Sequence, residues 1–78
     1  MTKREEVLNT VIEVLNLDRE KVDEKSRYEQ ALEAGKKFMF FQLNAVLEDR
    51  FNTEFDIYSL EADTLGETID YILSVIGE

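Results

Sequence analysis

The segment from Gly35 to Phe51, GKKFMFFQLNAVLEDRF, has no interior glycine and is rich in large apolar side chains. At 3.6 residues per turn, one stripe of the resulting helix is apolar, with Asn44 beside it; the stripe comprises Phe40, Leu43, Leu47 and Phe51. We expect this helix to form the centre of a small core. Its first two turns are apolar nearly all round, so they are either enclosed by the chain or face a partner.

A chain of 78 residues has little material for enclosing such a helix. It makes one domain, residues 1–78, with too little interior for a deep pocket of its own. The sequence has no cysteine and no histidine, so the usual ligands of zinc or copper and the usual nucleophile and base pairs are missing. Adjacent carboxylates such as Asp23 and Glu24 fit solvated surface better than catalysis. We therefore expect no enzyme activity, no catalytic residue and no metal site.

The first helix has a clear start and stop. Thr2-Lys3-Arg4-Glu5 has the form of a capping box, which predicts a helix from Lys3 to Leu15. Asn16 suits the left-handed position that ends helices, and Leu17 can fold back onto the last turn. The helix buries a broad apolar stripe, made of Val7, Leu8, Val11, Ile12, Val14 and Leu15.

The last helix follows the same pattern. Thr64-Leu65-Gly66-Glu67 is a capping box that opens a helix to Ile76, and Gly77 ends it. The side expected to be buried carries Leu65, Ile69, Ile72, Leu73 and Ile76.

Two weaker elements connect these helices. Ser26-Arg27-Tyr28-Glu29 is a further capping-box pattern, which opens either a short helix ending at Gly35 or a helix that continues through Gly35. After the central helix, a helical turn is expected from Ile57 to Glu61, anchored by Phe55, Ile57, Tyr58 and Leu60. The fold class is therefore all-α: a small bundle of three main helices with one or two short ones.

The net charge of −9 is unevenly distributed along the chain. Residues 1–35 carry six basic and nine acidic groups, residues 36–51 carry three and two, and residues 52–78 carry seven acidic groups and no basic one. This balance argues against nucleic acid and favours basic protein partners or simple solubility. The longest apolar run, Phe38 to Phe41, is too short for a membrane span, and the N-terminus does not open a signal sequence. We expect a soluble cytoplasmic protein.

Taken in order, several segments resemble the acyl carrier protein family. They are the Leu15-Asn16-Leu17 turn, the acidic loop with Val22, Leu47-Glu48-Asp49-Arg50-Phe51 followed by Asn52-Thr53-Glu54-Phe55, and Thr64-Leu65 leading into Ile69-Asp70-Tyr71-Ile72. The resemblance spans nearly the whole chain. It implies the three-helix carrier fold and a place beside acyl, polyketide or peptide assembly enzymes.

The family's attachment site is altered in this sequence. Counted back from Phe51, the serine that carries phosphopantetheine in the family corresponds to Lys37, and the preceding aspartate to Lys36. A lysine amine cannot replace the serine hydroxyl in that transfer, so we expect no phosphopantetheine and no other cofactor. Two cations at a helix start would also cost roughly 0.3–1 kcal/mol each if exposed.

These substitutions predict a binding module without a prosthetic group. Its partner would be a protein, either a biosynthetic enzyme or a second copy of the chain. The candidate partner-binding residues follow the central helix: Lys36, Lys37, Phe38, Met39, Phe41, Ala45, Glu48 and Asp49. Two alternatives stay open. In the first, Phe38, Met39 and Phe41 are buried beneath residues 18–34. In the second, the chain is a carrier, natural or engineered, that uses another attachment position.

Overall fold

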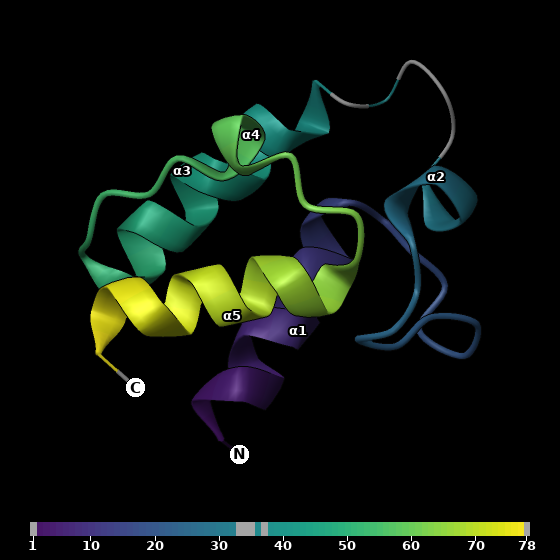
Figure 1. Cartoon of the computed structure of the whole chain (residues 1–78), viewed down its shortest axis with the longest axis horizontal. Coiled ribbons are helices and arrows are strands. Elements are labelled where there is room, and N and C mark those ends of the chain that lie inside the picture. The colour runs from purple at the N-terminus through teal and green to yellow at the C-terminus, as the bar shows by residue number, and fades with distance from the viewer. Residues whose placement is uncertain (1, 33–35, 37, 78) are drawn as a thin grey trace.

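This computed structural model describes residues 2–32, 36 and 38–77. These residues form three long helices and two single-turn helices joined by loops (Figure 1). The five elements are α1 (Lys3–Val14), α2 (Tyr28–Ala31), α3 (Met39–Phe51), α4 (Ile57–Leu60) and α5 (Leu65–Ile76). The predicted all-α class, with three main and two short helices, is confirmed.

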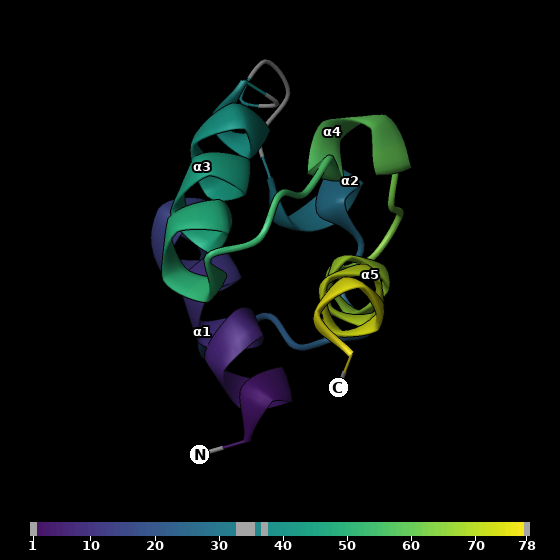
Figure 2. The same cartoon turned by 90° about the vertical axis from the view of Figure 1, so that its left-hand side faces the viewer.

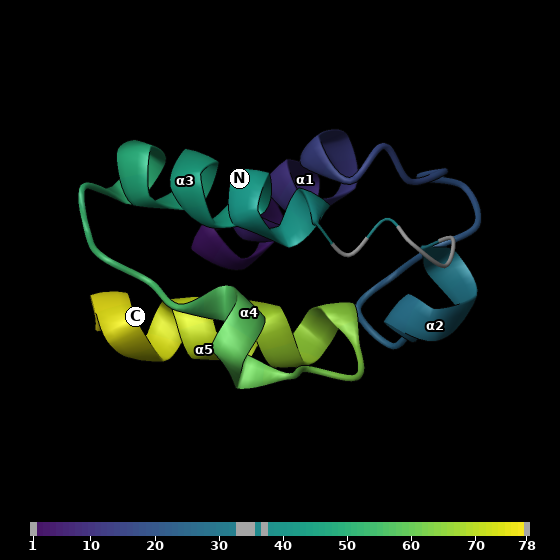
Figure 3. The ribbon, with the colours of Figure 1, turned by 90° about the horizontal axis from the view of Figure 1, so that it is seen from above.

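The helix α1 packs against both α3 and α5 and so joins the two sides of the domain. Viewed end-on, α3 lies on one side and α5 on the other, with α4 above α5 (Figure 2). Seen from above, α3 and α5 form two separate rows (Figure 3). The apolar stripes of the long helices meet in the centre, where seven described apolar side chains are fully buried: Val7, Val11, Leu43, Leu47, Leu65, Ile69 and Ile72.

The ends of α1 and α5 follow the sequence signals. Thr2 Oγ1 accepts a hydrogen bond from the Glu5 amide at 3.1 Å, and Thr64 Oγ1 accepts one from the Glu67 amide at 3.2 Å. Each bond satisfies an amide that the helix itself leaves unpaired. Asn16 has the predicted positive φ of 55°, although α1 ends at Val14, one residue before the predicted Leu15.

The predicted capping role of Ser26 is wrong. Its hydroxyl accepts a hydrogen bond from the Asp23 amide at 2.9 Å, which closes a turn in the preceding loop. The helix α2 begins at Tyr28 without a side-chain cap and ends at Ala31, because Leu32 is extended. A helix continuing from here into α3 is therefore also wrong; Gly35 itself lies outside the described residues.

The central helix starts later than predicted. We expected it from Gly35, but α3 begins at Met39, and Phe38 precedes it with no side-chain cap. The segment from 35 to 41 contains no Ser, Thr, Asp or Asn that could cap an earlier start. The expected core stripe is confirmed: Leu43 and Leu47 are fully buried, and Phe40 and Phe51 pack against the core.

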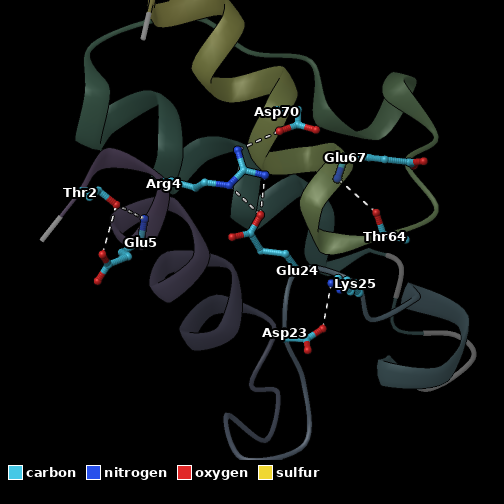
Figure 4. A network of polar contacts seen from close by, with 9 residues as sticks. All are labelled: Thr2, Arg4, Glu5, Asp23, Glu24, Lys25, Thr64, Glu67 and Asp70. Atoms are coloured by element: carbon cyan, nitrogen blue, oxygen red, sulfur yellow. Dashed lines mark hydrogen bonds and ion pairs between the residues drawn. The ribbon is translucent and has the colours of Figure 1, made fainter.

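The loop between α1 and α2 is fastened to the start of α5. Figure 4 shows Arg4 between two carboxylates, Glu24 of this loop and Asp70 of α5. The Gly66 amide donates to the Glu24 carbonyl oxygen at 2.8 Å, and a Cβ at Gly66 would lie 2.9 Å from that oxygen. Glycine is therefore required for this close approach of two backbones.

Candidate functional site

Two polar side chains of α3 hold the following connection and thereby position α4. Asn44, the polar interruption beside the core stripe, is buried, and its Oδ1 accepts a hydrogen bond from the Ile57 amide at 3.0 Å. One turn later, Glu48 Oε2 accepts from the Phe55 amide at 2.9 Å. Both bonds pair backbone amides that no helix satisfies. They fix α4 beside the first half of α3.

Three aromatic side chains meet at the surface where α4 and the start of α3 come together. Phe38, Phe41 and Tyr58 are 60%, 59% and 51% exposed. The Phe41 and Tyr58 rings pack with centroids 4.7 Å apart and planes inclined by 38°. We call these three residues the aromatic patch. Exposed large aromatic side chains of this kind are enriched where proteins bind other proteins.

The aromatic patch borders a cleft of about 800 Å³. The cleft lies between α2, the start of α3, α4 and the start of α5, so four segments distant in sequence build it. Its apolar lining, besides the aromatic patch, consists of Tyr28, Leu32, Phe40, Ile57 and Ala62. A volume of this size suits a small molecule or an inserted group of side chains.

Two buried hydroxyl groups belong to the cleft lining. The Tyr28 hydroxyl and Thr68 Oγ1 are 2.7 Å apart and share one hydrogen bond, with both residues buried. Burial raises the pKa of Tyr28 to about 12, an effect that the hydrogen bond to Thr68 partly offsets. The phenol is therefore neutral at pH 7. The Phe40 ring meets Tyr28 edge to face at 4.9 Å and holds it in place.

The charged groups among the described residues that line the cleft are mainly acidic, with three carboxylates and one guanidinium. Arg27 lies 3.6 Å from the carboxylate of Glu29. The other two carboxylates, Glu61 and Asp63, lie in the connection between α4 and α5 and have no ion-pair partner among the described residues. The cleft thus combines an apolar interior with an acidic rim.

The predicted partner-binding residues differ in their exposure. Phe38 and Phe41 lie at the cleft, whereas Met39 is partly buried against the core. Lys36 is exposed but lies three residues before α3, so the predicted electrostatic cost at the helix start does not apply to it; Lys37 lies outside the described residues.

The remaining predicted residues lie further along α3. Ala45 and Asp49 are exposed one and two turns after Phe41. Glu48 is half-buried and accepts a hydrogen bond from the Phe55 amide, so its carboxylate stabilises the segment that follows α3.

Sequence reasoning missed much of the cleft. Tyr58 and Leu60 were expected to anchor the connection in the core, but both are exposed, and only Phe55 and Ile57 are buried. No sequence motif indicated that Glu61 and Asp63 would line a cleft. The available signal was the pair of apolar segments around residues 38–41 and 57–60, each with more large side chains than one core face needs.

Among the described residues, no group of three or more carboxylates is arranged to hold a metal ion. Nor does any described helix have the length and apolar character needed to cross a membrane. The chain matches no protein-family model, no curated protein and no solved structure in comparisons with each.

Proposed function

We propose that this chain is a small carrier-like binding module that holds a protein partner at the aromatic patch and the adjoining cleft, without a prosthetic group. The observation that carries the proposal is the exposure of Phe38, Phe41 and Tyr58 beside a cleft with an apolar interior. Burying one such side chain on binding contributes about 1.5–3 kcal/mol. The resemblance to acyl carrier proteins suggests an accessory role beside acyl, polyketide or peptide assembly enzymes.

The positions of the hydroxyl side chains support the absence of phosphopantetheine. Residues 33–42 contain no serine or threonine, so the start of α3 offers no hydroxyl for attachment. The three serines lie elsewhere: Ser26 accepts from the Asp23 amide, Ser59 is on α4, and Ser74 donates to the Tyr71 carbonyl on α5. A binding role is favoured over catalysis because the chain has no histidine or cysteine and no lysine is among the described residues that line the cleft.

The binding role is tested by replacing Phe41 with Gln in the full chain. We expect Phe41→Gln to fold normally, because the ring is largely exposed, and to lose a partner that the wild-type chain captures from cells that produce it. Val75→Gln, an exposed apolar side chain on α5 outside the cleft, is the matched control. The partner is then purified and titrated against the three chains by calorimetry. Equal affinity of wild type and Phe41→Gln would rule out the proposed surface.

Intact mass measurement tests the absence of the prosthetic group. The chain is produced together with a broad-range phosphopantetheinyl transferase, with a known carrier protein as the positive control. We expect an unchanged mass for this chain and a modified mass for the control. A gain of one phosphopantetheine would instead support the alternative, a carrier with another attachment position, and Ser59→Ala would then test the exposed serine on α4.

A further inference from the structure

We infer that the partner bound at the cleft is a basic amphipathic helix, which inserts apolar side chains between α2, α3 and α4 and places Lys or Arg side chains at Glu61 and Asp63. This inference rests on the function proposed above and specifies the chemistry of its partner. Binding of an amphipathic helix in an apolar groove is a recurring mode of peptide recognition, in which side chains one turn apart provide the anchors.

The charges around the cleft favour a basic partner. Arg27 is the one basic residue among the described residues that line the cleft, and it already lies beside Glu29. Glu61 and Asp63 therefore remain available, since neither has an ion-pair partner in the described part of the chain. Complementary charges at the rim of an interface fix the orientation of the partner and accelerate its association.

The backbone at Glu61 provides a second observation. Its φ of 54° is left-handed, a conformation that favours Gly or Asn over a residue with a long side chain. The other non-glycine residues with positive φ in the described chain are Asn16 and Asn52, which suit this conformation. Glu61 is thus an unfavourable choice for the local backbone, and it places a carboxylate at the cleft. Strain of this kind is often retained at functional sites.

Charge also argues against two other occupants. A second copy of a chain with net charge −9 would bring like charges together across the same acidic rim. Anionic membrane surfaces attract clusters of Lys and Arg, and this chain has the opposite balance. A basic helix has neither disadvantage.

The test uses three synthetic peptides with the same apolar stripe and polar faces of Lys, Gln or Glu. Each peptide of about 16 residues spans about 24 Å as a helix. Affinity for the full chain is measured by calorimetry at about 0.05 M and about 0.3 M NaCl. We expect the Lys peptide to bind most tightly and to lose affinity with salt, because exposed charge pairs are screened.

Three variants, one of them a control, assign the binding to the cleft. Neutralising the rim with Glu61→Gln and Asp63→Asn should weaken the Lys peptide by about two- to fivefold per carboxylate. The matched control, Glu13→Gln with Glu54→Gln, changes the net charge equally at exposed positions outside the cleft and should leave the affinity unchanged. Glu61→Gly removes the carboxylate and the strain together, so it should weaken binding while the melting temperature stays the same or rises.

Equal or tighter binding of the Gln or Glu peptide would overturn the inference, as would binding of none of the three. Two other results would also overturn it. One is a wild-type chain that sediments as a dimer while Phe41→Gln sediments as a monomer. The other is binding of a medium-chain fatty acid in place of the peptides. None of these results requires the proposed function to fail. That function fails separately, if Phe41→Gln leaves the affinity for the captured partner unchanged.

Discussion

At the scale of single residues, the buried pair of Tyr28 and Thr68 links the cleft to the stability of the fold. Tyr28 is the most buried residue of the short helix α2, and its amide donates to the Asp63 carbonyl oxygen at 2.9 Å. The same residue therefore attaches α2 to the connection that carries the acidic rim. Its phenol is protonated in the folded chain because burial disfavours the phenolate.

This burial predicts a loss of stability at alkaline pH. The pKa of Tyr28 is raised from 10.0 to about 12 in the folded chain, so the folded state holds its proton more tightly than the unfolded state. The resulting stabilisation is complete below about pH 10 and is lost as the pH rises through about 12, by about 2–3 kcal/mol in total. Urea unfolding between pH 8 and pH 12 measures this decline.

The variant Tyr28→Phe separates this effect from general alkaline unfolding. It should be less stable than wild type at neutral pH, because the Thr68 hydroxyl loses its partner, but its stability should fall less steeply above pH 10. Tyr58→Phe, at an exposed tyrosine, is the control and should keep the wild-type slope. Equal slopes for Tyr28→Phe and wild type would contradict the assignment.

At the scale of elements, α4 depends on α3 for its position. A helix of four residues is not stable alone, because the cost of starting a helix exceeds the gain from one turn. Its attachment comes from the buried Ile57 side chain, from the bond between the Ile57 amide and Asn44, and from the Phe41 and Tyr58 ring contact. The position of Tyr58 in the aromatic patch therefore depends in part on Asn44.

Replacing Asn44 with Leu tests this dependence. The substitution keeps the branched shape at Cγ but leaves the buried Ile57 amide without an acceptor, which should lower the free energy of unfolding by about 1–3 kcal/mol. The Tyr58 ring should also separate from Phe41, which changes the ring-current shifts of both residues in NMR spectra. Gln42→Leu removes an exposed amide from the adjacent position and should change stability by less than about 0.5 kcal/mol. Similar losses in both variants would show that Asn44 has no special role.

At the scale of the whole molecule, the sequence predicted the framework much better than the site. Thr2 and Thr64 marked their helices correctly because a cap depends on residues three positions apart, which the sequence shows directly. Ser26 fitted the same pattern, but its hydroxyl accepts a hydrogen bond from the Asp23 amide instead of capping a helix. Tyr58 was expected in the core for the same kind of reason, since hydrophobicity alone does not reveal whether a neighbouring element covers a side chain. The cleft combines four separate segments, so its existence depends on tertiary packing that no local pattern contains.

The net charge of −9 acts on the whole fold and predicts its response to salt. The domain has a radius of gyration of 11.4 Å, so most of its charges lie within two or three Debye lengths of one another at about 0.1 M salt. Their mutual repulsion destabilises the compact state, and it exceeds the attraction in exposed pairs such as Arg4 with Asp70, which contribute about 0–1 kcal/mol.

Raising NaCl from about 0.02 M to about 0.3 M should therefore raise the melting temperature by several degrees, given that about 1 kcal/mol corresponds to about 4–8 °C for a domain of this size. Thermal unfolding followed by circular dichroism measures the shift, and Arg4→Gln should show a larger rise than wild type because it adds one more unbalanced negative charge. A melting temperature that falls with salt would show that attraction within the Arg4, Glu24 and Asp70 group outweighs the repulsion of the whole molecule.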